Sequence, residues 1–161
     1  AGGNSCRIFG RWEEFCDLPI EQIRWGVDVN LMGTVYFCHE AMRQMRKQKS
    51  GVIINFGSIT GLEGDTCGLD YAISKSAIMN GLNKSLAKEG ARYGVRVNCV
   101  APGPVLTRPG MANMKTALGR AADPQEIVDM VLYLASERSS FVTGATILMD
   151  GGRHLLMEDG V

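Results

Sequence analysis

The spacing of apolar residues along the chain predicts helices and strands in alternation. From Pro19 to about Lys47, apolar residues recur every three or four positions, which is the spacing of one helix face. The run 52–56 is rich in β-branched residues and predicts a strand that is buried on both faces. A second helical period covers 71–93, and the run 95–100 predicts the next strand.

Polar residues and prolines mark the ends of these elements. Asp17 is suited to cap the first helix, and Ser50-Gly51 is expected to end it. Pro102 and Pro104 are expected to stop the second strand, because proline cannot donate to a strand ladder. The segment Asp123-Pro124-Gln125-Glu126 predicts a helix start, with a cap, a first-turn proline and an acid three residues after the cap.

A last strand is predicted at 146–149, so the element order is strand, helix, strand, helix, strand. That order is typical of the α/β class, in which a parallel sheet is covered by helices. We expect residues 1–161 to form a single domain, since the length suits one hydrophobic core.

Composition narrows the possible partners. Of the 161 residues, 17 are Lys or Arg and 17 are Asp or Glu, so the net charge is zero and favours neither nucleic acid nor an anionic membrane surface. Four basic residues cluster where the first helix should end, and we interpret them as partners of the helix dipole rather than a phosphate-binding patch. They are Arg43, Arg46, Lys47 and Lys49. No apolar run approaches about 18 residues and no signal peptide opens the chain, so we expect a cytoplasmic protein without a membrane span.

The cysteines and histidines do not suggest a metal site. Five cysteines, an odd number, are scattered without a C-x-x-C pair, and we expect free buried thiols in a reducing cytosol. His39 and His154 are far apart and have no neighbour at metal-ligand spacing.

Tyr71 and Lys75 carry the first chemical signal. They are four residues apart on a predicted helix and therefore share one face. A free tyrosine has a pKa of about 10, and an adjacent ammonium lowers that pKa by favouring the phenolate. The pair can give a proton to a carbonyl oxygen or take one from an alcohol. Taken alone, the spacing is equally typical of a surface tyrosine beside a solvated lysine.

Ser58 strengthens this interpretation. It follows the predicted strand 52–56, at the carboxyl end where parallel sheets place their ligands. A hydroxyl there can hydrogen-bond a substrate oxygen as charge develops on it. The alternative is an ordinary turn serine, and no histidine lies near Ser58 in the pattern to make it a hydrolytic nucleophile.

Two further features are ambiguous by themselves. Asn30 and Gly33 are poor helix formers in the middle of the first helix, so a bend there could offer a backbone carbonyl to a bound water. A tolerated polar position on the exposed face is the simpler interpretation of Asn30. The segment 102–107, Pro-Gly-Pro-Val-Leu-Thr, could approach a flat ligand ring closely or form an ordinary turn.

Taken in order, these motifs resemble those of the short-chain dehydrogenase/reductase family over nearly the whole chain. The matching segments are AGG at the start, VNLMG, INFGSITG, YAISK, RVNCVAPGPVLT, and the stretch from GRAADPQEI to LMDGG. The resemblance implies a partial Rossmann-like, doubly wound parallel sheet. It also implies an NAD(P)-dependent oxidoreductase that interconverts a carbonyl and a secondary alcohol, acting on a small molecule.

The resemblance assigns a role to each matched residue. Tyr71 would be the catalytic acid and base, and Lys75 would lower its pKa and hold the nicotinamide ribose. Ser58 would polarise the substrate carbonyl, and Asn30 would hold the water of a proton relay leading to Lys75. The cofactor-binding set would be Tyr71, Lys75, Pro102, Gly103, Val105 and Thr107, with Val105 facing the carboxamide and Thr107 the diphosphate.

The chain departs from the family pattern in two places. The family's glycine-rich nucleotide turn and the units around it are not among the 161 residues, so the choice between NAD and NADP is open. The connector 107–120 is short, so the substrate lid is expected to be reduced. Leu62, Glu63, Cys67 and Leu69 either line the substrate pocket or face water.

The strand 52–56 should therefore present an unpaired apolar edge. Three explanations are open: the residues belong to a longer protein, they are a natural or engineered fragment that dimerises through the edge and its helices, or they are the ordered part of a cleaved protein. Two functions follow, an oxidoreductase or a non-catalytic truncated remnant that acts as an oligomerising module. We expect a homodimer or homotetramer through the helices at 19–47 and 71–93.

Overall fold

Three parallel strands form the centre of the molecule and confirm the predicted sheet. The computed structural model describes residues 3–156. The strands are β1 (Gly51–Phe56), β2 (Val95–Pro102) and β3 (Thr146–Met149), in the spatial order β1-β2-β3. In register, Gly51 of β1 lies opposite Val95 of β2, and Cys99 of β2 lies opposite Thr146 of β3. This is the α/β architecture expected from the order of the elements.

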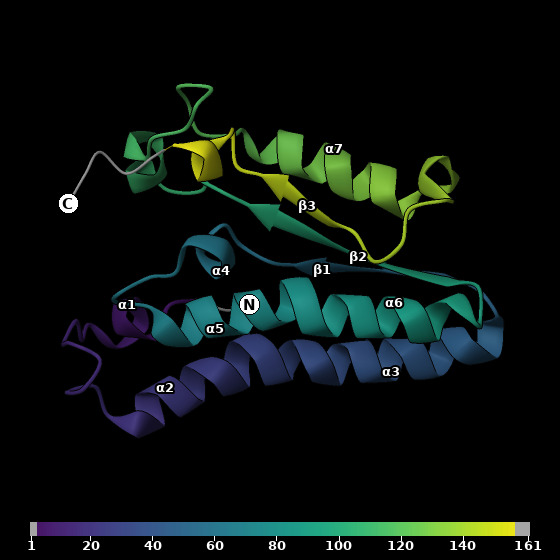
Figure 1. Ribbon diagram of the computed structural model, residues 1–161, viewed down its shortest axis with the longest axis horizontal. Coiled ribbons are helices and arrows are strands. Elements are labelled where there is room, and N and C mark those ends of the chain that lie inside the picture. The colour runs from purple at the N-terminus through teal and green to yellow at the C-terminus, as the bar shows by residue number, and fades with distance from the viewer. Residues whose placement is uncertain (1–2, 157–161) are drawn as a thin grey trace.

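Helices cover both faces of the sheet (Figure 1). The two long helical stretches lie on one face, and α7 lies on the other. The α-helices are α1 (Ser5–Phe9), α2 (Ile20–Val27), α3 (Gly33–Gln48), α4 (Thr60–Glu63), α5 (Leu69–Ala77), α6 (Asn83–Ala91) and α7 (Pro124–Ala135). Two π-helical turns, η1 (Asp28–Met32) and η2 (Ile78–Leu82), join α2 to α3 and α5 to α6; the short 3₁₀ turns are η3 (Pro109–Asn113), η4 (Glu137–Ser139) and η5 (Arg153–Leu155).

The first long helix confirms its predicted extent but not its predicted cap. Asp17 does not cap this helix. The N-cap position is Pro19, which makes no side-chain hydrogen bond, and the Pro19 carbonyl accepts a hydrogen bond from the Gln22 N–H. At the other end, Lys49 takes the left-handed conformation with φ 58°, one residue before the expected stop, so Gly51 is free to open β1.

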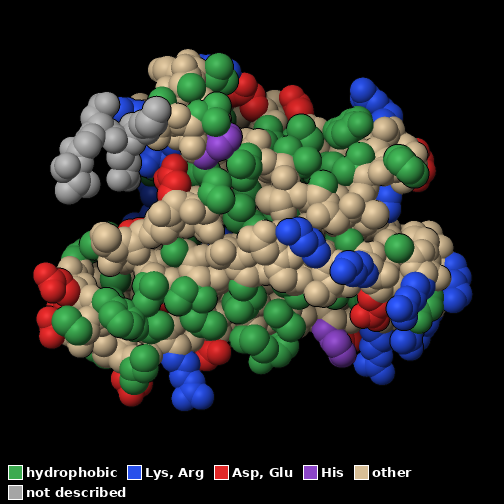
Figure 2. Space-filling model, viewed as in Figure 1, with side chains coloured by type: hydrophobic (Ala, Val, Ile, Leu, Met, Phe, Trp, Pro, Cys, Tyr) green, Lys and Arg blue, Asp and Glu red, His purple; other side chains and the backbone are tan. Residues whose placement is uncertain are grey.

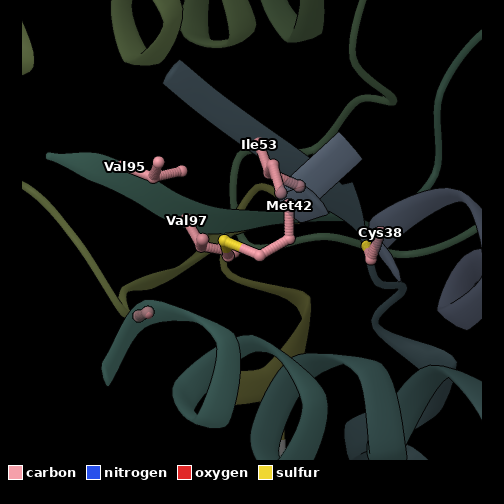
Figure 3. Close-up of a cluster of buried hydrophobic side chains, with 6 residues drawn as sticks. Cys38, Met42, Ile53, Val95 and Val97 are labelled. Carbon is pink, nitrogen blue, oxygen red and sulfur yellow. The ribbon is translucent and has the colours of Figure 1, made fainter. Parts of the chain in front are cut away.

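The core below the sheet is formed by side chains of α3, β1 and β2. Figure 3 shows Met42 extending from α3 toward Val97, with Ile53 and Val95 beside it. Val97 is fully buried and Met42 is 5% exposed. The predicted apolar stripe of the first helix is therefore the face that packs on the sheet.

β2 is longer than predicted. The strand continues through Pro102, which pairs with Met149 of β3 at the last position of the ladder. Proline is tolerated there because it is the last residue of the ladder, and its carbonyl accepts a hydrogen bond from the Ile59 N–H at 2.9 Å, in the turn after β1.

The start of α7 confirms the predicted capping signal. The Asp123 carboxylate accepts a hydrogen bond from the Gln125 N–H at 2.8 Å, and the Glu126 carboxylate accepts one from the Asp123 N–H at 2.8 Å. Arg120 binds Glu126 with two hydrogen bonds of 2.7 and 2.8 Å, and these bonds lower the pKa of Glu126 to about 2.

The state of the cysteines confirms one expectation and corrects another. All five cysteines are free, but only Cys6, Cys38 and Cys99 are buried, so the expectation of uniformly buried thiols was wrong for Cys16 and Cys67. Within residues 3–156, no helix combines the length and the hydropathy needed to cross a membrane.

Candidate active site

A pocket of about 480 Å³ opens at the carboxyl ends of β1 and β2. Its wall contains Ser58 and Tyr71, together with four residues that follow β2 or end it: Pro102, Gly103, Val105 and Thr107. The start of α7 closes one side through Pro124, Ile127 and Val128. Six of the eight site residues expected from the sequence thus line one cavity, at the position that parallel sheets reserve for ligands.

Ser58 is held in place by the turn that follows β1. It is 9% exposed, and its Oγ accepts a hydrogen bond from the Thr60 N–H at 3.2 Å. The turn packs directly on the helix that carries Tyr71, because a Cβ at Gly61 would lie 2.7 Å from the Ser76 nitrogen. The glycine therefore allows the serine turn and the tyrosine helix to approach each other.

Tyr71 and Lys75 lie one turn apart on α5. The Lys75 Nζ is 5.5 Å from the centre of the Tyr71 ring, and it donates a hydrogen bond to the Phe56 carbonyl at 2.8 Å. Burial lowers the pKa of Lys75, because a charged ammonium is poorly solvated in this position. The ammonium therefore lies close to the phenol at the end of β1.

Lys75 lines a different cavity from Tyr71. A groove of about 530 Å³ runs along the free edge of β1, and its walls include Lys75, Asn30 and Asn55. Phe56 lines both the groove and the pocket. The structure thus brings Ser58 and Tyr71 together in the pocket, and Lys75 and Asn30 together in the groove.

Asn30 is buried, not exposed as its simpler interpretation required. It is 3% exposed and lies in the π-helical turn η1. Its side chain donates to the carbonyls of Gly26 and Gly3 at 2.8 and 3.0 Å and accepts from the Gly3 N–H at 3.0 Å. The amide therefore clamps the N-terminal segment against α2, and the expected irregularity of this helix is confirmed as a π turn.

The loop after β2 leaves one backbone donor available. The Val105 carbonyl accepts from the Thr107 N–H at 2.6 Å, whereas the Val105 N–H donates no hydrogen bond to any group in residues 3–156. An unpaired N–H beside Pro102 and Gly103 fits the flat, amide-bearing edge of a nicotinamide ring. The donors in this loop and the hydroxyl of Tyr71 are thus compatible with that cofactor.

Sequence reasoning missed part of the pocket wall. Arg7, Asp65, Arg108, Met111 and Met114 line the pocket. In contrast, Leu62, Glu63, Cys67 and Leu69 do not line it; Leu62 and Glu63 are exposed. Arg7 comes from α1 and Arg108 from the loop after β2, more than 100 residues later, so no local pattern could have joined them.

Comparison with known proteins places this geometry in a family. The profile of the family described as enoyl-(acyl carrier protein) reductase matches residues 7–154. Carbonyl reductase family member 4 of Xenopus tropicalis is 40% identical over 144 residues, which are 85% of this chain and 59% of that protein. The chain belongs to the short-chain dehydrogenase/reductase family. Other relatives of this chain are described as a 3-oxoacyl-[acyl-carrier-protein] reductase and a 3-alpha-(or 20-beta)-hydroxysteroid dehydrogenase.

Solved structures of this short-chain dehydrogenase/reductase family share the fold. A 3-oxoacyl-[acyl-carrier protein] reductase with bound NAD from Brucella melitensis superposes with a TM-score of 0.81 at 36% identity, over 87% of this chain and 55% of that one. A structure described as a short chain dehydrogenase/reductase family protein gives 0.84 at 31% identity, over 97% and 65%. The chain thus spans between about half and two thirds of the length of these relatives.

Proposed function

We propose that this chain carries the proton-transfer site of an NAD(P)-dependent oxidoreductase that interconverts a carbonyl and a secondary alcohol. The observation that carries the proposal is the pocket at the end of β1 and β2. Ser58 and Tyr71 line it together with the loop 102–107, and the Lys75 ammonium lies 5.5 Å from the Tyr71 ring. A small-molecule carbonyl can meet both hydroxyl groups in this space.

In this mechanism the two hydroxyl groups act on the same substrate oxygen. The Ser58 Oγ donates a hydrogen bond to the carbonyl oxygen and polarises it, and the Tyr71 Oη delivers the proton as the alcohol forms. Lys75 stabilises the phenolate that remains. When bound, NAD or NADP supplies the hydride in this direction and accepts it in the reverse direction.

We propose that the phenolate is reprotonated from the groove side of Phe56. Asn30 and Lys75 line the same groove, which has room for several waters. The Asn30 carbonyl accepts from the Thr34 hydroxyl at 2.8 Å, and we propose that a water in the groove binds this carbonyl as well. Such a water would link that carbonyl to the Lys75 ammonium.

The same residues would hold the nicotinamide half of the cofactor. We propose that Lys75 and Tyr71 bind the ribose hydroxyls, that the free Val105 N–H binds the carboxamide, and that Thr107 approaches the diphosphate. The fold relative from Brucella melitensis is described with bound NAD, which supports a nicotinamide cofactor.

The test is the substitution Tyr71→Phe, which removes one oxygen from the pocket wall. We expect turnover with NADH or NADPH and a panel of ketones to fall by at least about a hundredfold, since general acid catalysis contributes 10²–10⁴. Thermal unfolding should be unchanged, because the ring is retained. Tyr93→Phe is the matched control, since Tyr93 lies at the far end of the same helical stretch beside Arg46 and Lys49.

A Tyr71→Phe protein as active as the parent would refute the proposal. The alternative of a non-catalytic oligomerising module predicts no NADH or NADPH binding at millimolar concentration by calorimetry. Saturable binding of either nucleotide would exclude that alternative.

A further inference from the structure

A buried carboxylate lies next to Tyr71 in the sequence and has no cationic partner within residues 3–156. Asp70 is 2% exposed and forms no ion pair in that part of the chain. Its Oδ1 accepts a hydrogen bond from the Ser5 hydroxyl at 3.0 Å, and its Oδ2 accepts one from the Ser5 N–H at 3.4 Å. Ser5 is 1% exposed and opens α1. The two residues are 65 positions apart in the sequence.

The contact extends to α2. The Gln22 side chain, 7% exposed, donates to the Ser5 hydroxyl at 3.3 Å, so this hydroxyl accepts from α2 while it donates to α5. Gly26 of α2 packs against the carboxylate from the other side, because a Cβ there would lie 1.7 Å from the Asp70 Oδ2. A side chain at position 26 would displace Asp70. Three helices thus meet at one carboxyl group.

Within residues 3–156, the contact with Ser5 provides the only side-chain hydrogen bonds that reach the first turn of α5 from another helix. The N-cap residue is Gly68, which offers no side chain to cap the helix. A Cβ at Gly68 would lie 2.3 Å from the Asn4 Nδ2, so the start of α5 also packs on the segment that precedes α1. Tyr71 is the next residue after Asp70, and a shift of this turn moves the phenol directly.

Stability alone does not account for a carboxylate in this position. A buried charge with only neutral hydrogen-bond donors costs free energy that an apolar side chain of similar size would avoid. A fully bonded buried polar group does, however, specify one arrangement of the elements that it joins. The free-energy cost of burying the Asp70 carboxylate is therefore consistent with a need to hold the joined helices in one arrangement.

We propose that Asp70 and Ser5 are a positioning pair that fixes the Tyr71 phenol in the pocket. The N-terminal segment before α1 thereby becomes part of the catalytic arrangement. Neither residue touches the substrate; both act through the first turn of α5. The inference rests on the proposed function, in which Tyr71 is the proton donor.

The experiment compares Ser5→Ala, Asp70→Ala and Asp70→Asn in the enzyme. Ser5→Ala removes the hydrogen bond from the hydroxyl and Asp70→Ala removes both bonds, and we expect kcat to fall on the order of tenfold to a hundredfold while the KM values for ketone and nucleotide stay within about twofold. Asp70→Asn keeps an Oδ1 acceptor for the Ser5 hydroxyl and should retain most of the parent kcat. Ser139→Ala is the control, since Ser139 is an equally buried serine that binds the Leu134 carbonyl far from the pocket.

A second measurement keeps the test independent of turnover. Amide hydrogen exchange over residues 70–75 should accelerate in Ser5→Ala and Asp70→Ala but not in Ser139→Ala. Parent kcat in Ser5→Ala, or exchange unchanged from the parent, would overturn the inference. Equal loss of kcat in Asp70→Asn and Asp70→Ala would overturn it as well, because the hydrogen bond from the Ser5 hydroxyl, which Asp70→Asn can keep, would then not be what positions Tyr71. A parent without turnover would refute the proposed function, and the exchange rates would still decide the role of the pair.

Discussion

At the scale of single residues, the environment of Lys75 is the most unusual in the site. Its ammonium has no carboxylate partner within residues 3–156 and is held by one carbonyl, that of Phe56. Burial is the main cause that lowers its pKa from the ordinary value of 10.5. A lysine that serves only the fold would be better placed in water. The position therefore favours a chemical role.

The lowered pKa of Lys75 predicts a pH-dependent cost to stability. Below the folded-state pKa the group is charged in both states, and its burial destabilises the fold. As the pH rises through the folded-state pKa toward 10.5, the folded state loses its proton first and the cost disappears. Lys75→Met should therefore unfold at a higher temperature than the parent at pH 7, and the difference should shrink toward pH 10.5.

Thermal unfolding of both proteins between pH 7 and pH 10.5 measures this effect. Lys84→Met is the control, since Lys84 is exposed on α6 of the same helical stretch. A Lys75→Met protein that is less stable than the parent by the same amount at both pH values would contradict the argument.

At the scale of elements, the two long helical stretches each contain one π turn close to the site. η1 carries Asn30, and η2 begins three residues after Lys75. A π turn shifts the helical register by one residue and so changes which side chains face inward. In η1 this shift lets the Asn30 side chain reach the carbonyls of Gly3 and Gly26. In a regular helix, Asn30 was expected to lie on the exposed face.

The start of α7 offers a separate prediction at this scale. Asp123→Ala removes the N-cap acceptor of Gln125, and we expect a loss of about 1 kcal/mol of unfolding free energy. Urea denaturation measures this loss. Asp129→Ala, in the exposed middle of α7, should cost little because alanine is the best helix former. Equal losses in the two variants would show that the cap has no special role.

At the scale of the whole molecule, two apolar surfaces lie side by side. Among residues 3–156, β1 pairs with β2 on one edge only, and the groove of about 530 Å³ follows its other edge. Figure 2 shows hydrophobic side chains gathered over α2 and α3. Phe37 of α3 is 83% exposed and also lines the groove. The predicted free edge of β1 is thus present, and exposed edges of this kind favour association.

We expect the chain to form a homodimer or homotetramer through this region. Phe37→Glu should shift light scattering toward the monomer at micromolar concentration, because it places a charge on the apolar surface. Phe141→Glu is the control, since Phe141 is fully exposed in the loop after η4, away from α2 and α3. A parent that stays monomeric over a wide concentration range would contradict the prediction.

The sequence by itself determined the order of the elements, the parallel sheet and the meeting of Ser58 with Tyr71. These follow from local periodicity and from the rule that parallel strands present their carboxyl ends at one edge. The capping signal at Asp123 was equally local and was confirmed. The second strand ends at Pro102 as expected, but the predicted run 95–100 stopped two residues short of it, because the missing N–H of proline matters little at the last position of a ladder.

Only the tertiary structure decided which of the two cavities each site residue lines and which distant residues contact Asn30 and Asp70. Asn30 binds Gly3 across 27 positions and Asp70 binds Ser5 across 65, and no periodic pattern records such pairs. Besides Asn30 and Gly33, the sequence holds a further local sign in Gly26, a poor helix former in the same helical stretch. A glycine is needed at position 26 because the Asp70 carboxylate of α5 approaches it closely. Contacts between distant segments depend on how the helices pack, and that packing is fixed only when the whole core forms.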